Sequence, residues 1–424
     1  MSIVLGAIAD DFTGATDLAG LLARSGYPVS LRLGLPMATE ARDNAAAFEI
    51  IALKCRTIPK NLAVDQVRSA YAWLSARGAK RLYWKYCSTF DSTEEGNIGP
   101  VAEALMAEMG VSQTIYCPAF PENGRNVFMG HLFVGEALLN ESAMKDHPLT
   151  PMRDSSLVRL LTPQVSGKVG LINRLTVARG VEVLRTRLME LAAEGIEHVI
   201  VDAVANDDLS IIAEATLDMP LISGGSALAM PLPALLAHSG IIDKSSETSP
   251  EPQIRNGQIV LSGSCSAMTL KQVEHYRDRV ASYRLDPAVL AESGIADALK
   301  WLQEYPVEMP KLIYASADPA SVQAAQSKLG AERAGQIVEQ ALADLASASF
   351  KLGIRRFVVA GGETSGAVAQ ALGITKLRVG KEIAPGVPWT YANISGETVA
   401  LALKSGNFGT ATFFSDALQM LEVA

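Results

Sequence analysis

Short apolar runs alternate along the chain with stretches in which apolar residues recur every three or four positions. The runs are typical of strands buried on both faces of a sheet, and the longer period is typical of helices that bury one face. Strands are predicted at residues 3–9, 50–53, 82–85, 114–117, 169–172, 198–201, 258–261, 312–315 and 357–360. Such alternation predicts an α/β fold, with mostly parallel sheets covered by helices on both faces.

One polar stretch interrupts this alternation. Residues 244–257 are polar and carry two prolines, and a new apolar run begins directly after them. A stretch of this kind is typical of an interdomain linker, and a chain of 424 residues is long enough for two or three domains. We therefore predict two domains, residues 1–243 and 258–424, each a mostly parallel sheet flanked by helices, with a cleft between them.

Composition and charge exclude several classes of protein. The chain is 49% hydrophobic and 19% charged, a globular balance, and its net charge of −8 provides no basic surface for nucleic acid. The N-terminus has no basic leader, and no apolar run reaches the ~18 residues of a membrane span. We expect a soluble cytoplasmic protein without nucleic-acid or membrane partners. The oligomeric state stays open, and a homo-oligomer is compatible with the sequence.

Cysteines and histidines are too scattered to predict a metal site built from side chains. The 4 cysteines form no Cys-x-x-Cys pair, and the 5 histidines form no pair at metal-binding spacing. We predict no metal-binding residues, and we expect the cysteines to be free thiols.

Charged and polar residues follow the predicted strands of the first domain, at the sheet edge where ligands bind. An arginine there can hold a carboxylate through two hydrogen bonds, and an aspartate beside a hydroxyl can act as general base in phosphoryl transfer. We predict four catalytic residues: Asp10, Asp11, Lys85 and Asp91. We predict six residues that bind a small polyhydroxy acid: Thr13, Gly14, Arg56, Ser88, Asn123 and Arg125.

Structural explanations compete with these roles. The aspartates at 10–11 could do no more than cap the first helix, because Asp is a favoured N-cap. Lys85 could lie on the surface. Arg56 and Arg125 could form internal ion pairs with the aspartates. Asp17, on the predicted first helix, is expected to be solvated rather than to bind a ligand.

Glycine and hydroxyl residues follow the predicted strands of the second domain. Glycine lets a backbone approach a ligand closely, and the free N–H groups of a helix start attract phosphate. Two strand-to-helix turns and a third turn near the C-terminus have this composition. The residues predicted to bind a nucleotide are Ser262, Gly263, Ser264, Gly361, Gly362, Glu363, Thr364, Gly406 and Asn407.

Known fingerprints of other enzyme classes do not occur. A Walker A motif would need lysine where Ala367 follows residues 361–366, and no Gly-x-Gly-x-x-Gly motif follows the first predicted strand. The second absence disfavours a dinucleotide-binding dehydrogenase. A serine hydrolase is disfavoured because the chain has no Gly-x-Ser-x-Gly motif.

Taken together, these motifs resemble those of the four-carbon acid sugar kinase family. The matching stretches, in the family's order, are residues 8–17, 85–100, 261–266, 360–366 and 403–409. The resemblance implies a substrate-binding N-terminal domain, a nucleotide-binding C-terminal domain, and ATP with Mg²⁺ as cofactors. By position, Ser262, the turn at 361–364 and Gly406 match the family's ATP contacts. The motifs do not identify which aspartate is the general base.

Within the family, residues 85–93, 96–100 and 385–389 resemble the branch that acts on 3-oxo acids. Threonate and erythronate kinases usually carry Lys-x-Asp-Ser-Thr at the first of these stretches. The resemblance implies phosphorylation of the 4-hydroxyl of a 3-oxo-tetronate such as 3-dehydro-erythronate, in the catabolism of four-carbon acid sugars. A sister kinase for D-threonate, L-threonate or D-erythronate and a binding protein without turnover remain alternatives, and the D or L hand of the substrate is open.

Overall fold

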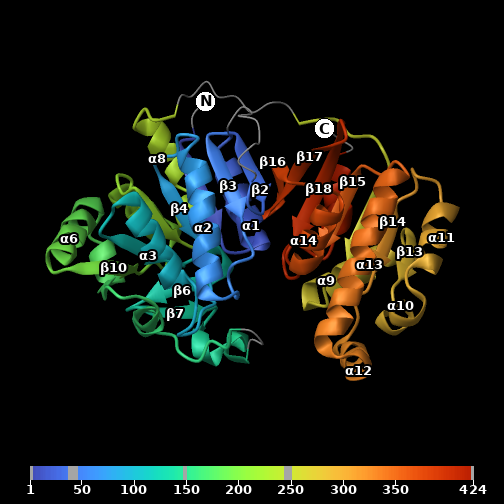
Figure 1. Ribbon diagram of the computed structural model, residues 1–424, viewed down its shortest axis with the longest axis horizontal. Coiled ribbons are helices and arrows are strands. Elements are labelled where there is room, and N and C mark those ends of the chain that lie inside the picture. The colour runs from blue at the N-terminus through green and yellow to red at the C-terminus, as the bar shows by residue number, and fades with distance from the viewer. Residues whose placement is uncertain (1–2, 37–45, 147–149, 243–250, 422–424) are drawn as a thin grey trace. The chain divides into compact units, whose positions relative to one another are not determined.

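The computed structural model describes residues 3–36, 46–146, 150–242 and 251–421. The chain divides into two compact units, residues 1–248 and 249–424. Each is an α/β unit, as predicted, and each is described by itself below (Figure 1). The first part of the predicted linker, up to residue 250, lies outside the described residues. The cleft between domains stays a prediction.

In the first unit, parallel strands form one sheet in the order β2–β3–β1–β4–β11–β5–β10–β9. These strands are β1 (Leu5–Ala9), β2 (Val29–Leu33), β3 (Phe48–Ala52), β4 (Leu82–Lys85), β5 (Thr114–Cys117), β9 (Lys168–Ile172), β10 (Ile196–Val201) and β11 (Leu221–Gly224). A small antiparallel sheet contains β6 (Arg125–Phe128), β7 (His131–Val134) and β8 (Ala137–Leu138). All five residues of β1 and of β3 are buried, as expected for central strands of a parallel sheet.

Helices cover both faces of the larger sheet. The α-helices are α1 (Phe12–Ala23), α2 (Lys60–Ser75), α3 (Ile98–Met109), α4 (Leu157–Leu161), α5 (Arg174–Val177), α6 (Val181–Ala193), α7 (Asn206–Ala215) and α8 (Leu232–His238). Short 3₁₀ helices are η1 (Pro121–Asn123), η2 (Leu139–Glu141), η3 (Ala143–Asp146), η4 (Thr162–Gln164) and η5 (Ala227–Ala229). Helices α2 and α3 pack together on the face seen in Figure 1, whereas α1 and α7 both contact η5.

The connections of this unit diverge between β1 and β4. Helix α1 leads from β1 to β2 on one side, and α3 leads from β4 to β5 on the other. Open α/β sheets bind ligands where adjacent strands send their connections in opposite directions, because a crevice forms outside the carboxyl ends of those strands. Asp10 and Lys85 lie at these two ends, and Asp10 N donates to Lys85 O at 3.0 Å.

In the second unit the strand order is β13–β14–β12–β15–β18–β17–β16. The strands are β12 (Gln258–Ser262), β13 (Ala281–Arg284), β14 (Lys311–Tyr314), β15 (Arg356–Ala360), β16 (Lys376–Ala384), β17 (Val387–Ile394) and β18 (Glu397–Lys404). The pairs from β13 to β18 are parallel, whereas β16, β17 and β18 form an antiparallel meander. The sheet is therefore mostly parallel at one side and antiparallel at the other.

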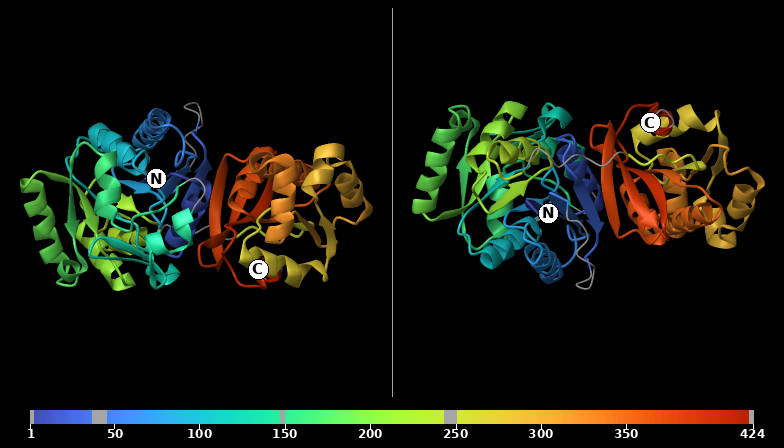
Figure 2. Two further views of the ribbon diagram at one scale, coloured as in Figure 1. Left: turned by 90° about the horizontal axis from the view of Figure 1, so that it is seen from below. Right: turned by 90° about the horizontal axis from the view of Figure 1, so that it is seen from above.

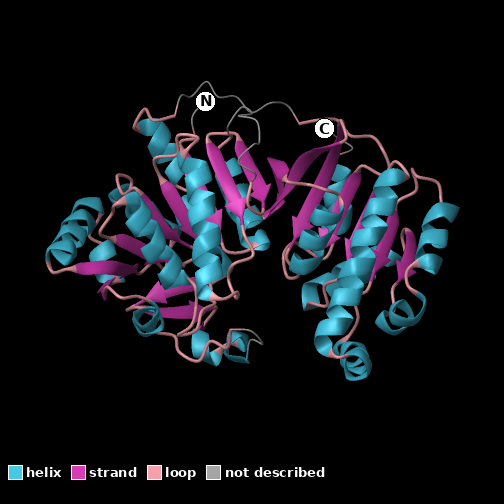
Figure 3. Ribbon diagram, in the orientation of Figure 1, coloured by secondary structure: helices cyan, strands magenta, loops and turns pink. Residues whose placement is uncertain are grey.

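The helices of the second unit also form two layers (Figures 2 and 3). They are α9 (Ala267–Arg277), α10 (Pro287–Ser293), α11 (Ala296–Glu304), α12 (Pro319–Leu329), α13 (Ala331–Lys351), α14 (Gly362–Ala371) and α15 (Phe413–Met420). Tyr276 of α9 and Phe413 and Phe414 of α15 share an apolar cluster with Val358 and Ala360 of β15. Helices α13 and α14 pack together on the opposite face.

Connections diverge in the second unit as well, between β12 and β15. Helix α9 leads from β12 to β13 on one side, and α14 leads from β15 to β16 on the other. The predicted glycine-rich turns follow these two strands, so they lie at the point where a ligand is expected. The third turn follows β18, which is the neighbour of β15 in the sheet.

The strands that were not predicted are β2, β6, β7, β8, β11, β13, β16, β17 and β18. Strand β2 is not an apolar run, because Ser30 and Arg32 alternate with apolar residues, yet both polar side chains are buried against Glu49 of β3. Strand β16 is half exposed and lacks a continuous apolar run. In the described part of the chain, no helix is both long and apolar enough to cross a membrane.

Candidate functional site

An arginine holds three aspartates at the carboxyl edge of the first sheet. Arg56 follows β3, and its Nε and Nη2 donate to Asp10 Oδ2 and Oδ1 at 2.7 and 2.9 Å. The same guanidinium lies 2.8 Å from Asp11 Oδ1 and 3.4 Å from Asp91 Oδ2. We call Asp10, Asp11 and Asp91 the aspartate cluster. The alternative that Arg56 forms internal ion pairs is confirmed, and its role in substrate binding stays a prediction.

Burial sets the electrostatics of this cluster. Asp10 is 3% exposed, and burial raises its pKa above its usual range, although the neighbouring Arg56 opposes this effect. Burial alone would lower the pKa of Arg56, but the charges of Asp10 and Asp11 raise it well above its usual range. Arg56 is therefore always charged. A buried carboxyl with a raised pKa is suited to accept a proton near neutral pH.

Asp11 has two contacts that bear on its role. It is the N-cap of α1, and its Oδ1 accepts a hydrogen bond from Gly14 N at 2.9 Å. Asp11 therefore caps the helix, as the structural alternative states, but it does more than cap, because the same oxygen also pairs with Arg56. In the loop after β4, Thr89 Oγ1 donates to Asp91 Oδ1 at 2.5 Å and fixes the orientation of that carboxylate.

Lys85 ends β4 beneath the start of α1. It is 2% exposed, so the alternative that it lies on the surface is wrong. Its Nζ donates to Tyr86 O at 2.7 Å. Gly14 leaves the room that this side chain needs, since a Cβ there would lie 2.6 Å from Lys85 Nζ and 2.4 Å from Asp11 Oδ1. Glycine at this position therefore brings α1 close to the lysine.

Asp17 was expected to be solvated, and this expectation is wrong. The side chain is buried, and Ser226 Oγ donates to its Oδ2 at 2.5 Å. Its Oδ1 has no hydrogen-bond partner among the described residues. Burial raises the pKa of Asp17 to about 6, while the charge of Lys85 opposes the rise. The missed signal is helical spacing, because Asp17 follows Gly14 by three residues and so shares its face of α1.

A cavity of about 550 Å³ opens beside Arg56. Its lining includes Lys60, at the start of α2, with Ser92, Thr93 and Asn97. The buried atoms Ser92 Oγ and Asn97 Oδ1 have no hydrogen-bond partners within the described ranges. Cations and unpaired polar atoms suit a small acid that carries hydroxyl groups. Sequence reasoning did not assign Ser92 or Asn97 to the site, although both lie in the matched stretch 85–100.

Four predicted residues of this domain lie outside these contacts. The side chains of Thr13 and Ser88 are half buried and make no hydrogen bond within the described part of the chain. Asn123 ends η1, and its carbonyl accepts a hydrogen bond from Arg125. Among the described residues, Arg125 forms no ion pair with the aspartate cluster, so the alternative of an internal ion pair is wrong for this residue. Its Nε is buried without a partner there.

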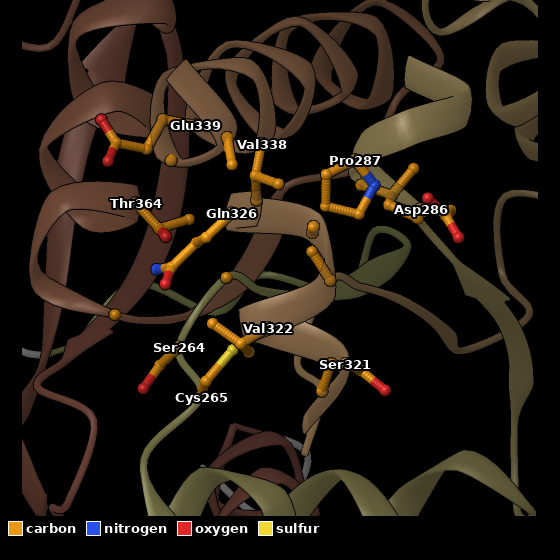
Figure 4. Close-up of a pocket in the computed structure, with 18 of the residues that line it drawn as sticks. Ser264, Cys265, Asp286, Pro287, Ser321, Val322, Gln326, Val338, Glu339 and Thr364 are labelled. Atoms are coloured by element: carbon orange, nitrogen blue, oxygen red, sulfur yellow. The ribbon is translucent and has the colours of Figure 1, made fainter. Parts of the chain in front are cut away.

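The second unit has its own cavity of about 550 Å³ at the carboxyl ends of β12 and β15. Figure 4 shows Thr364 and Ser264 at one side of this cavity and Pro287 and Asp286 at the other. From the predicted set, the lining residues are Gly263, Ser264, Gly361, Gly362, Glu363, Thr364 and Gly406. Further lining residues include Cys265, Leu285, Val322, Gln326, Val338 and Glu339. The cavity thus combines glycine-rich turns with an apolar wall.

Glycine is required where these turns meet. A Cβ at Gly263 would lie 2.3 Å from Thr364 Oγ1, and a Cβ at Gly406 would lie 2.5 Å from Ser264 Oγ. Gly361 has φ 125°, a conformation that other residues rarely adopt. The absence of side chains leaves backbone N–H groups at the start of α14 open to an anion.

Two residues predicted to bind the nucleotide are not among those that line this cavity. Ser262 is buried, and its hydroxyl lies 2.8 Å from the hydroxyl of Ser316. Asn407 is exposed on the turn beyond Gly406. Both are next to residues that line the cavity, and their assignment to the nucleotide stays a prediction.

Both halves of the chain match models of known domains. Residues 5–232 match the model described as a sugar-binding N-terminal domain. Residues 259–414 match the model described as a nucleotide-binding C-terminal domain. The two matches therefore coincide with the two units and with the different character of their cavities.

Curated relatives match over nearly the full chain. The 3-oxo-tetronate kinase of Burkholderia multivorans is 48% identical over 423 residues, which cover 99% of this chain and 98% of the relative. The enzyme of the same name from Cupriavidus necator is 49% identical, with 99% and 97% covered. That of Haemophilus influenzae is 42% identical, with 98% and 100% covered.

Two solved structures are similar over the same length. A crystal structure of a Salmonella typhimurium protein, provisionally described as a tRNA synthase, has a TM-score of 0.89 at 42% identity and covers 98% of this chain and 99% of its own. A Haemophilus influenzae protein has a TM-score of 0.81 at 41% identity, with 98% and 100% covered. On the strength of the kinase relatives and both domain matches, the chain belongs to the four-carbon acid sugar kinase family, in which it is similar to the 3-oxo-tetronate kinases.

Proposed function

We propose that this protein is an ATP-dependent kinase that phosphorylates the 4-hydroxyl of a 3-oxo-tetronate and releases ADP. The observation that carries the proposal is the identity of 42% to 49% with 3-oxo-tetronate kinases over nearly the full chain. The two cavities support it, because the first offers the cations Arg56 and Lys60 to an acid, although Glu94 and Glu95 also line it, and the second presents glycine-rich turns for phosphates. Because ATP is its cosubstrate, we expect the enzyme to act in the cytoplasm.

The acid sugar would bind beside Arg56. The cavity there offers Lys60 and the free N–H groups at the start of α2 to a carboxylate. The unpaired Ser92 hydroxyl and Asn97 carbonyl oxygen would bond to hydroxyl groups of the substrate. Arg56 lines this cavity and also pairs with the aspartate cluster, so the cluster lies next to the proposed acid site.

The nucleotide would bind in the second cavity, with its phosphates on the turns and its base against the apolar wall. The Gly263 and Gly361 turns allow close approach, and the start of α14 contributes N–H groups. The described residues contain no group of three or more His, Cys, Asp or Glu placed to hold a metal ion. Mg²⁺ would therefore be held mainly by phosphate oxygens and water, and it would neutralise phosphate charge.

Phosphoryl transfer mainly requires positioning and charge neutralisation. An aspartate of the cluster would accept the proton of the 4-hydroxyl as that oxygen bonds to the γ-phosphorus and ADP leaves. Arg56 would hold the carboxylates in place, and Lys85 would balance charge as it develops. We infer these roles from the contacts described above, and variants must determine which aspartate is the base.

The first test measures ADP release from MgATP with a substrate panel. The panel contains 3-oxo-tetronates of both hands, D- and L-threonate, and D-erythronate. Turnover restricted to the 3-oxo acids is expected. Turnover only on threonate or erythronate would keep the kinase but overturn the proposed substrate. Nucleotide binding without turnover on any acid would contradict the proposed reaction.

Three variants then test the aspartate cluster. Asp10→Asn, Asp11→Asn and Asp91→Asn are compared with Asp154→Asn, which changes an aspartate that pairs with Arg159 elsewhere in the first unit. Loss of the general base is expected to lower kcat by about 10²-fold to 10⁴-fold. Asp154→Asn should retain wild-type rates. Wild-type rates in all three cluster variants would refute the assignment.

A further inference from the structure

Lys404, the last residue of β18, is buried without a carboxylate partner. The residue is 1% exposed, and in the described part of the chain it makes no ion pair. Its Nζ donates to Gly406 O at 2.9 Å and to Thr269 Oγ1 at 3.1 Å. Burying an ammonium group away from water is costly unless an opposite charge compensates it. The contacts of Lys404 with the described residues do not provide that charge.

These hydrogen bonds join Lys404 to the wall of the nucleotide cavity. Thr269 Oγ1 donates to Gly406 O at 2.7 Å and accepts from Ser266 Oγ at 3.2 Å. Gly406 lines the cavity, and Ser266 is the N-cap of α9. Lys404 therefore ties the turn after β18 to the start of α9.

The ammonium lies close behind the surface on which phosphates are proposed to bind. A Cβ on Gly406 would lie 2.5 Å from Ser264 Oγ and 2.8 Å from Ser266 Oγ, so the turn touches the first glycine-rich loop. Ser264 lines the cavity together with Gly406. In surroundings that exclude water, an uncompensated positive charge acts strongly on an anion bound nearby.

Charged side chains on the neighbouring elements do not compensate the charge of Lys404. The titratable side chains on the surrounding helices are Lys271, Glu274, His275, Tyr276 and Arg277 on α9, Glu363 on α14, and Asp416 on α15, and those on the two flanking strands are Arg356 on β15 and Tyr391 on β17. Lys404 makes an ion pair with none of them. Burial lowers the pKa of Lys404 to about 7, with no opposing charge. A bound polyphosphate would favour the ammonium form and raise this pKa again.

We propose that Lys404 is a positioning residue for the nucleotide phosphates, which holds the Gly406 turn and takes up a proton when the nucleotide binds. This inference depends on the proposed nucleotide site. The phosphates of the bound nucleotide would supply the negative charge that the Lys404 ammonium lacks among the described residues. Because the protonated form is favoured in the complex, nucleotide affinity is expected to fall as the pH rises above about 7.

Proton uptake can be measured directly by calorimetry. MgADP is titrated into the full-length protein at pH 8, where its phosphates are ionised, in two buffers with different ionisation enthalpies. Wild-type protein is expected to take up close to one proton per nucleotide. Lys404→Met should abolish this uptake and weaken binding about tenfold, the loss of one charge-assisted contact. Lys404→Arg, which stays charged, should retain much of the affinity without uptake.

Lys311 provides a matched control. It is also 1% exposed, and its Nζ donates to Pro306 O and to Met309 O. Unlike Lys404, which ends its strand, Lys311 is the first residue of β14, and it does not line the cavity. Lys311→Met should lower stability and leave proton uptake unchanged. Undiminished uptake in Lys404→Met would overturn the proposal, and so would loss of uptake in Lys311→Met. If wild-type protein failed to bind MgADP, the nucleotide site itself would be refuted.

Discussion

Burial decides the chemical character of individual residues near both candidate sites. Asp10, Asp17, Lys85 and Lys404 are charged residue types that the fold withdraws from water. Asp10 retains Arg56 as its partner. Among the described residues, Asp17 accepts a hydrogen bond only from a serine hydroxyl, and Lys404 donates only to a hydroxyl and a carbonyl. Perturbed groups of this kind are concentrated at functional sites, because catalysis and anion binding use them.

Asp17 gives a prediction for stability. Its pKa is about 6 in the folded protein against 3.8 for the free group, so the folded state binds more protons between these values. Stability is therefore lost as the pH rises through this window. Asp17→Asn should raise the free energy of unfolding by about 1 kcal/mol at pH 4.5 and about 3 kcal/mol at pH 7.5. Denaturant titrations at both pH values measure this, and an equal effect at both would contradict it.

At the scale of elements, each cavity forms where neighbouring strands send their connections to opposite sides. In the second unit, this geometry brings three turns from adjacent strands together, and Gly263, Gly361 and Gly406 permit their contact. In the first unit, α1 packs closely against Lys85 because Gly14 has no side chain. The close packing of helix starts against strand ends thus depends on the absence of specific side chains.

A pair of glycine variants tests this packing. Gly263→Ala would place a Cβ 2.3 Å from Thr364 Oγ1, so the two turns must separate and MgATP binding should weaken at least tenfold. Gly366→Ala is the control, because a Cβ there meets nothing within 4 Å and alanine favours the helix. It should raise stability by up to about 1 kcal/mol and leave the KM for ATP unchanged. Equal KM values for both variants would contradict the prediction.

At the scale of the whole molecule, the proposed acid site and the proposed nucleotide site belong to two separate units of the chain. Each unit has its own core, its own sheet and its own cavity. The reaction nevertheless requires the hydroxyl and the γ-phosphorus to approach within about 3.5 Å. We therefore expect each ligand to stabilise its own unit first, and both together to change the arrangement of the units.

Hydrogen exchange and small-angle scattering test this division. MgADP alone is expected to slow amide exchange at residues 263–265, 361–364 and 404–406, and the acid alone at residues 54–60 and 88–97. Both ligands together should reduce the radius of gyration. Protection of the first unit by MgADP alone, or identical scattering with and without both ligands, would contradict the expectation.

Several features of this protein were determined by the sequence alone. Apolar runs predicted β4 and β5 to the residue, since strands buried on both faces must be continuously apolar. The alternation of strands and helices predicted the α/β class. Glycine and charged residues directly after strands indicated the two cavities, because in parallel sheets such residues lie at the ligand-binding edge.

The tertiary structure alone decided which side chains are buried and what they face. Strand β2 looks amphipathic because polar and apolar residues alternate in its sequence. Its polar side chains are nevertheless buried, since they bond to Glu49 of the neighbouring strand β3. Asp17 looks solvated until α1 is packed against Lys85, and the sequence does not show that the Ser262 hydroxyl lies beside that of Ser316. A pattern along the chain reports the periodicity of one element. Burial and partnership depend on residues far away in the sequence, which only the packing of elements brings together.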